Sequence, residues 1–347
     1  MIVVSALLAT APLRADGGAA HRTRQAPPVK MGTSGGSAAD SSLFYCCGGT
    51  LGALVRRDGV VHILSNNHVL ARTGLATTGE DDVQPGLIDS GCQSGSSNVV
   101  GDFAGNIVPL GTGNVDAALS VARTNVDATG SILDIGVPCS AVQPAAVGLA
   151  VEKSGRTTGL TRGTVQAVNV TVTVQYQRGC NTGRKFYVTY TNQVNITPGS
   201  FSAGGDSGSL IVSDDGSPNA VALLYAGSSS STIGNPIQDV VNAFTAGGHS
   251  FSFVGTACGS FVQSAPIAGP SLAGLDAARL VKEDHESSLL GRRGVLGVGV
   301  GVSESDATQA AIVIFVDQSD PGAWQRLPSA IDGVPVRLIP TDPFVAR

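Results

Sequence analysis

"SFSAGGDSGSLIVSDDG", residues 200–216, places a serine inside a glycine-rich turn that leads directly into an apolar run. A serine hydroxyl is a weak nucleophile unless a base takes its proton and a third group orients that base. Ser207 therefore predicts a nucleophilic site only if a histidine and a carboxylate occur in suitable positions elsewhere. Without them it is a small residue in a turn.

The candidate base lies in "VVHILSNNHVLAR", residues 60–72. His62 is inside an apolar run, which favours a packed strand residue. His68 follows "SNN", where the strand is expected to end, and an imidazole at such an exit can face a cleft. The candidate acid is Asp116 in the alternating run "GNVDAALSVA", residues 113–122. A carboxylate buried there needs a partner, for example an imidazole. The alternative is a strand-edge aspartate that faces water.

Short β-branched runs broken by glycine extend from about residue 43 to 262 and predict an antiparallel barrel or sandwich. One helix is predicted over residues 237–244, with Asn235 as its cap and Pro236 in its first turn. We expect four regions: a flexible N-terminal lead-in (1–42), a large mostly β domain (43–263), a linker (264–274) and a small α+β domain (275–347).

The composition excludes some function classes. The 347 residues carry a net charge of −5 without a basic stripe, so a nucleic-acid partner is not expected. The six cysteines form no CxxC pair and have no histidine at ligand spacing, so no metal and no cofactor is expected. They permit up to three disulfides in fifteen possible pairings.

The location of the protein is suggested by the same residues. An even number of cysteines is typical of exported proteins. The N-terminus "MIVVSALLATAPLRADGG" is either a clipped signal peptide or a disordered start. The chain has no apolar run of membrane-spanning length, so no membrane insertion is expected. We predict a secreted or cell-envelope protein; its oligomeric state is not predicted.

Four motifs, "SNNHVLA", "NVDAALSVA", "SGRTTGLTRGTV" and "GGDSGS", occur in that order. Together they resemble the trypsin-like serine endopeptidases of the chymotrypsin fold, especially the bacterial streptogrisin and alpha-lytic branch, over roughly residues 46–259. The resemblance implies a mostly β fold with two six-stranded antiparallel barrels. It also implies that His68 is the base, Asp116 the acid and Ser207 the nucleophile in hydrolysis of protein or peptide substrates through an acyl-enzyme intermediate.

The resemblance also implies supporting residues around the nucleophile. The backbone N–H groups of Gly205 and Ser207 are expected to stabilise the oxyanion. The carboxylate of Asp206 needs a counter-charge. By similarity to the alpha-lytic type, Arg156 is predicted to pair with Asp206 and to keep the turn formed.

Few residues of the sequence indicate which substrates are selected. Phe201 stands six residues before Ser207, where trypsin has an aspartate that selects basic side chains, so a preference for Arg or Lys is not expected. Tyr225, Ala226 and Gly227 correspond to the edge that a substrate peptide joins as an extra strand. Two departures from the family pattern, Val69 after the histidine and Ser209 after the nucleophile turn, do not touch the triad.

The sequence leaves two other functions to compare with a serine endopeptidase. An α/β-hydrolase would need glycine at position 209 and a histidine after the serine, but Ser209 breaks that motif and only His249 and His285 follow. A pseudoprotease that binds peptides without hydrolysing them stays an alternative, because suitable residue types do not establish geometry.

The C-terminal residues 275–347 predict a helix over 275–291, strands in "GVLGVGVGVSE", "AAIVIFVD" and "GVPVRLIP", and a short helix in "PGAWQRLP". "GVLGVGVGVSE" lacks the last glycine of a dinucleotide motif, and its alternating glycines suggest close packing against a helix. The element order predicts a ferredoxin-like fragment, reminiscent of propeptide domains. We expect this module to modulate access to the catalytic cleft.

Overall fold

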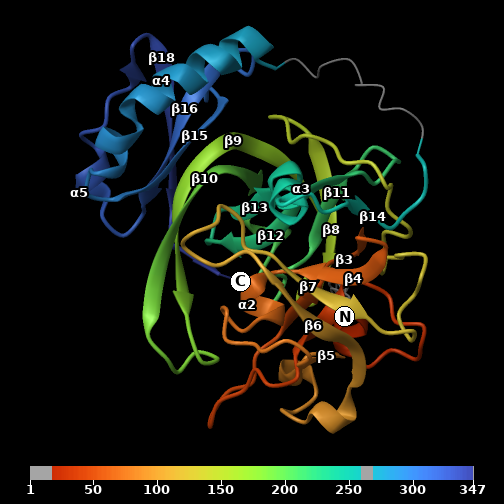
Figure 1. Ribbon diagram of the computed structural model, residues 1–347. Coiled ribbons are helices and arrows are strands. Elements are labelled where there is room, and N and C mark those ends of the chain that lie inside the picture. Colours follow the sequence, from red (N-terminus) through yellow and green to blue (C-terminus); the bar gives the residue numbers. More distant parts are fainter. Residues whose placement is uncertain (1–17, 259–268, 347) are drawn as a thin grey trace, which may run out of the picture.

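The computed structural model describes residues 18–258 and 269–346, whose strands form two sheets (Figure 1). The first sheet has the strand order β14-β3-β4-β7-β6-β5-β1-β2. Its strands are β1 (Thr33–Ser37), β2 (Gly49–Leu51), β3 (Ala53–Arg57), β4 (Val60–Ser65), β5 (Asp81–Gln84), β6 (Asn98–Ile107), β7 (Ala118–Ala122) and β14 (Phe251–Phe253). Because β2 and β3 are one strand interrupted at position 52, and β2 pairs with β1, these strands close into a six-stranded antiparallel barrel with β14 added.

The second sheet also closes on itself. Its order is β10-β13-β12-β11-β8-β9, and β9 pairs again with β10. The strands are β8 (Ala150–Gly155), β9 (Gly159–Gln177), β10 (Lys185–Thr197), β11 (Leu210–Ser213), β12 (Ala220–Gly227) and β13 (Thr232–Pro236). The predicted mostly β fold with two six-stranded antiparallel barrels is therefore confirmed.

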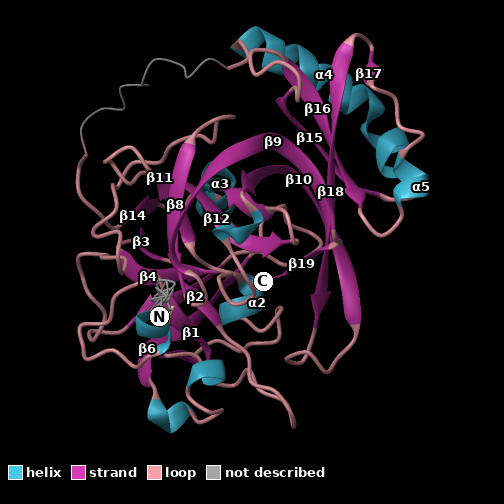
Figure 2. Cartoon of the chain, turned by 180° about the vertical axis from the view of Figure 1, so that it is seen from behind, coloured by secondary structure: helices cyan, strands magenta, loops and turns pink. Residues whose placement is uncertain are grey.

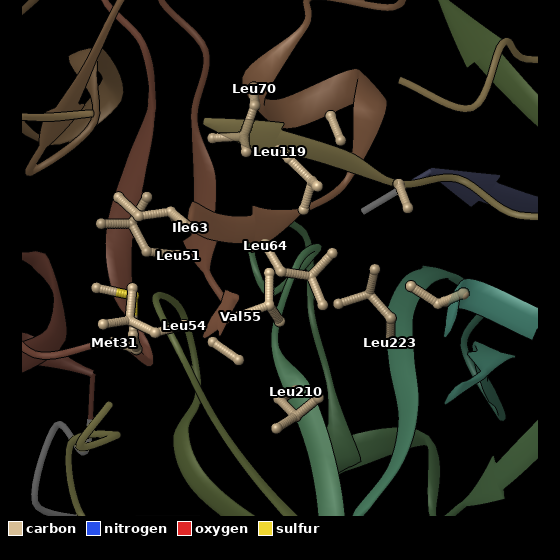
Figure 3. Close-up of a cluster of buried hydrophobic side chains, with 14 of the residues drawn as sticks. Met31, Leu51, Leu54, Val55, Ile63, Leu64, Leu70, Leu119, Leu210 and Leu223 are labelled. Carbon is tan, nitrogen blue, oxygen red and sulfur yellow. The ribbon is translucent and has the colours of Figure 1, made fainter. Parts of the chain in front are cut away.

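The hydrophobic core of the first barrel continues into the second. Figure 3 shows Leu51, Ile63 and Leu64 of the first barrel in one cluster with Leu210 and Leu223 of the second. All five side chains are nearly or fully buried. Burial of apolar surface thus joins the barrels across the seam at which the candidate site lies.

The helices are short apart from one. They are α1 (Ala19–Arg22), α2 (Asn67–Leu70), α3 (Ile237–Thr245), α4 (Leu272–Leu290) and α5 (Pro321–Trp324), with the 3-10 turns η1 (Leu87–Asp89), η2 (Ser94–Ser96) and η3 (Gly199–Phe201). The predicted helix over 237–244 is confirmed as α3, but its predicted cap is wrong. The Asn235 side chain accepts a hydrogen bond from the Asp116 backbone instead. No helix within the described ranges is long and apolar enough to span a membrane.

The C-terminal residues extend the second barrel (Figure 2). They form β15 (Val295–Val302), β16 (Ala310–Asp317), β17 (Ala330–Ile331), β18 (Val334–Thr341) and β19 (Phe344–Ala346) in addition to α4 and α5. β15 pairs with β9, so the sheet is continuous from the barrel into this segment. A Cβ on Gly297 would lie 2.9 Å from the Thr171 carbonyl oxygen, and one on Gly301 would lie 2.6 Å from the Gln166 carbonyl oxygen. The alternating glycines therefore allow close packing against strand β9, not against a helix as the sequence suggested.

Two predicted boundaries differ from the structure. Residues 18–42 of the expected lead-in include β1, and Val29 and Met31 are buried in the first barrel. The expected linker overlaps the start of α4, where the Ser271 hydroxyl accepts a hydrogen bond from the Gly274 N–H at 3.1 Å. Residues 1–17, which hold nearly all of the possible signal peptide, and residues 259–268, which hold the first five residues of the linker, lie outside the described residues. The division into separate domains stays a prediction.

All six cysteines form disulfides, and they are paired as Cys46–Cys92, Cys47–Cys180 and Cys139–Cys258. Disulfides persist in oxidising compartments, so this framework favours an extracellular location.

Candidate active site

His68 and Asp116 contact each other directly. His68 lies on α2, just after β4 ends, and Asp116 lies just before β7. His68 Nδ1 is 2.6 Å from Asp116 Oδ2, and the His68 backbone N–H donates to Oδ1 at 3.3 Å. Asp116 is fully buried, whereas the His68 side chain keeps 13% of its surface exposed. The carboxylate can therefore hold the ring orientation while the rest of the ring faces the cleft.

The second barrel completes the surroundings of Asp116. The Tyr176 hydroxyl, from β9, donates to Asp116 Oδ2 at 2.9 Å. The Asp116 backbone N–H donates to Asn235 Oδ1 at 2.9 Å, and Asn66 Nδ2 donates to the Asp116 carbonyl at 2.7 Å. Burial raises the pKa of Tyr176 well above its ordinary value, and the nearby Asp116 charge raises it further. Tyr176 thus stays a hydrogen-bond donor at all ordinary pH values.

Ser207 lies in the turn between η3 and β11 and is buried. Its hydroxyl donates to the Tyr225 carbonyl on β12 at 3.2 Å. His68, Gly204 and Gly205 line one cavity of about 640 Å³. The structure therefore brings the histidine and the turn of the candidate nucleophile to the same cavity.

The peptide groups of this turn are held in fixed directions. The Gly204 carbonyl accepts from Thr157 Oγ1 at 2.6 Å. The Asp206 carbonyl accepts from the Ser209 N–H at 3.0 Å and from Ser209 Oγ at 2.7 Å. Because N–H and C=O of a trans peptide point in opposite directions, these bonds orient the N–H groups of Gly205 and Ser207. Gly205 has a φ of +97°, which a residue with a side chain rarely adopts.

The predicted ion pair between Arg156 and Asp206 is wrong. Arg156 Nε and Nη2 lie 2.6 and 2.7 Å from the two carboxylate oxygens of Asp89 on η1. A bidentate pair of this kind uses the planar fork of the guanidinium fully, so Asp89 takes the arginine. Arg156 still lies against the turn, because a Cβ on Gly205 would be 2.6 Å from its Nη1.

The cation beside Asp206 is Lys153, a fully buried residue of β8. Its Nζ is 3.9 Å from Asp206 Oδ2. Burial lowers the pKa of Lys153 to about 8, and the Asp206 charge opposes that change. Backbone N–H groups of Thr157, Thr158 and Ala203 also donate to the Asp206 carboxylate, at 2.8, 3.2 and 2.9 Å. The Asp206 charge is therefore satisfied without Arg156.

The residues assigned to substrate selection lie in two places. Phe201 is buried in the core of the second barrel, and Lys153 Nζ lies 5.7 Å from its ring centroid. Tyr225, Ala226 and Gly227 form the end of β12. His62, the histidine not favoured from the sequence, is buried in β4 with Nδ1 3.0 Å from the Val60 carbonyl.

Sequence reasoning missed three polar residues of the site: Tyr176, Lys153 and Asp40. Asp40 lines the cavity, and burial raises its pKa to about 6, while Arg72 and His68 lower it. Lys153 had a usable signal, since a lysine inside the strand "LAVEKSG" needs a buried partner. Asp40, Cys47 and Cys180 lie close enough for a metal ion, but the two cysteines form a disulfide.

The resemblance to trypsin-like serine proteases is confirmed by a comparison with known proteins. The chain is 32% identical over 199 residues to Serine protease 1 of Streptomyces fradiae. The match covers 55% of this chain and 46% of the relative, so it spans about half the length of that protein. No protein-family model matches the chain.

Two solved structures are similar at lower identity. A glutamic-acid-specific serine protease is 21% identical, with coverage of 65% of this chain and 100% of that chain and a TM-score of 0.44. Thermobifida fusca protease A is 23% identical, with coverage of 61% and 95% and a TM-score of 0.39.

Proposed function

We propose that this protein is a serine endopeptidase in which His68, Asp116 and Ser207 form the catalytic triad. The observation that carries the proposal is the 2.6 Å contact of His68 with buried Asp116, at a cavity that the Ser207 turn also lines. The match to a serine protease over 199 residues supports the same reaction class.

The residues have separate roles in this mechanism. His68 takes the Ser207 proton as the hydroxyl attacks the peptide carbonyl, and later gives a proton to the leaving amine. Asp116 orients the imidazole and stabilises its positive charge. The backbone N–H groups of Gly205 and Ser207 stabilise the oxyanion, and each such donor is worth roughly 10²–10³ in rate.

The other parts of the site support this chemistry. Asp206, neutralised by Lys153, keeps the turn in the conformation that presents both N–H groups. A substrate peptide pairs with residues 225–227 as an added strand. Phe201 is buried in the barrel core and leaves its position without the negative charge that selects basic side chains in trypsin, so we expect no preference for Arg or Lys at the cleavage site. The disulfides and the lack of a basic stripe fit a secreted enzyme that acts on protein or peptide substrates.

The test is covalent labelling by a fluorophosphonate probe, which reacts with activated serines, read by intact mass. We expect the wild type to gain one adduct and Ser207→Ala and His68→Ala to gain none. His249→Ala is the matched control, because His249 is an exposed histidine bound to Asp58 far along the chain from the site. Labelling that survives Ser207→Ala would mean that another serine reacts. No labelling of either the wild type or a chain shortened to end at Thr341 would favour a peptide-binding pseudoprotease.

A further inference from the structure

The C-terminal strand β19 lies on the edge assigned to the substrate. It pairs antiparallel with β12 in the register Ala226↔Ala346 and Gly227↔Val345. On its other side it pairs in parallel with β9 (Phe344↔Val174 and Val345↔Gln175). β19 therefore fills a slot between two strands of the second barrel.

This slot opens into the candidate active site. Val345 and Ala346 line the same cavity as His68, Gly204 and Gly205. The carbonyl that accepts the Ser207 hydroxyl belongs to Tyr225, the residue before Ala226. β19 thus reaches the catalytic residues as a bound peptide would.

The strand is anchored by one side chain. Phe344 is buried against the aromatic and aliphatic residues of the second barrel, and its ring contacts Phe315 of β16 edge to face at 5.6 Å. Val345 keeps 39% of its surface exposed. The segment is therefore held by backbone pairing and by Phe344, and not by burial along its whole length.

We propose that β19 occupies the site that binds the backbone of a peptide substrate, so that the C-terminal segment blocks its own protease. The proposal rests on the proposed function, because that function makes the slot a substrate site. The enzyme becomes open to peptides when β19 leaves the slot.

Tethering makes this block effective even if the three-residue strand binds weakly. A linked segment acts at an effective concentration of about millimolar, which a free peptide must exceed to compete. Removal of the segment is therefore expected to raise peptide hydrolysis at low substrate concentration by roughly tenfold or more.

The first experiment measures occupancy without using activity. A fluorescent peptide with the sequence of residues 341–346, capped at both ends, is titrated against two Ser207→Ala proteins: the full chain and a chain ending at Thr341. We expect binding to the shortened chain and at least tenfold weaker binding to the full chain. The control peptide carries N-methyl groups at the positions of Val345 and Ala346, which remove the N–H donors of the strand, and it should not bind.

Equal binding to both chains, or no binding to a folded shortened chain, would overturn the proposal. If the shortened chain does not fold, Phe344→Ala in the full chain replaces it, because this change removes the anchor and keeps the length. Val345→Ala is its matched control, since the Val345 side chain is partly exposed and the backbone pairing remains.

The second experiment compares hydrolysis of a peptide library by the full and shortened chains with Ser207 intact. Faster hydrolysis by the shortened chain is expected, and equal rates would overturn the block while leaving the proposed function intact. If neither chain hydrolyses peptides but the shortened chain binds the strand peptide, the proposed function fails and the assignment of β19 to the slot stands.

Discussion

The surroundings of Asp116 and of Asp206 differ, although both aspartates belong to the candidate site and are fully buried. Asp116 is contacted by His68 and by the neutral Tyr176 hydroxyl. Asp206 is contacted by the ammonium of Lys153 and by three backbone N–H groups. One carboxylate is thus paired with a group that gains and loses a proton in the proposed reaction, and the other with a group that keeps its charge at neutral pH.

The difference shows that one site can contain a carboxylate whose partner changes its charge and a carboxylate whose partners stay fixed. The charge on His68 changes during each proposed turnover, so Asp116 must respond to it. The turn that presents the Gly205 and Ser207 N–H groups must not change, so Asp206 is bound on several sides. Mutations in the two regions are expected to have different effects on stability and rate.

The largest effect is expected for Lys153→Met, which leaves Asp206 buried without a cation. Removing one partner of a buried ion pair typically costs about 3–5 kcal/mol in the free energy of unfolding. The turn should lose its order as well, and the labelling rate should fall by roughly 10²-fold or more, as on loss of an oxyanion donor. Urea unfolding and labelling kinetics measure both; Lys185→Met, at an exposed position of β10, is the control.

The pair of Lys153 and Asp206 predicts that the free energy of unfolding depends on pH. The Lys153 pKa falls from its ordinary 10.5 to about 8 in the folded protein. Between these values the unfolded chain binds more protons than the folded chain, so this group makes the free energy of unfolding rise with pH. Its slope is at most about 1.4 kcal/mol per pH unit. The free energy of unfolding of the wild type should therefore rise from pH 8 to 10 relative to that of Lys153→Met; a constant difference between the two proteins would contradict the lowered pKa of Lys153.

A smaller effect is expected for Tyr176→Phe, which removes one hydrogen bond from Asp116 and keeps the ring. A hydrogen bond to a charged group is worth about 1.5–3 kcal/mol, so kcat should fall roughly 10- to 100-fold. KM should change less than kcat, because the Tyr176 side chain is buried and the residues of β9 that pair with β19 are Val174 and Gln175. Tyr187→Phe, at an exposed tyrosine of β10, should leave kcat unchanged. An unchanged kcat in Tyr176→Phe would show that His68 alone orients Asp116.

The smallest effect is expected for Ser209→Ala. The Ser209 hydroxyl is one of two donors to the Asp206 carbonyl, and the backbone N–H remains. Loss of one neutral hydrogen bond costs about 1 kcal/mol, or roughly fivefold in the labelling rate. Ser213→Ala, in β11 outside the turn, is the comparison. A loss as large as that of Lys153→Met would mean that the two kinds of support are equally important.

Local patterns predicted the mostly β fold, whereas the contact of His68 with Asp116 was implied by the resemblance of four ordered motifs to a known family. Repeated strands with glycine turns indicated the barrels, and four ordered motifs indicated His68, Asp116 and Ser207. The roles of these residues in catalysis stay a proposal.

The other contacts of the site join residues that are far apart in the sequence and carry no motif or periodic pattern. Arg156 pairs with Asp89, which lies on a three-residue 3-10 turn without any periodic pattern. Tyr176 is one aromatic residue in a long β-branched strand, where aromatic residues are ordinary. Strand β19 has three residues, too few for a period to be visible. Residues 18–42 contact the barrel partly through isolated bridges, such as Val29 with Val126 and Met31 with Ile132. Single bridges do not require a repeating pattern of apolar residues, so the sequence shows no periodicity there.

The disulfides divide the chain into a part that is cross-linked, up to Cys258, and a later part that is not. Cys47–Cys180 and Cys139–Cys258 overlap, so any single backbone cut between residues 47 and 258 leaves the pieces cross-linked. Every cysteine lies at or before Cys258, so residues 269–346 have no cross-link to the barrels. A cut after Cys258 would turn an intramolecular contact into a complex of two molecules. Dilution would then set how much of the C-terminal segment stays bound.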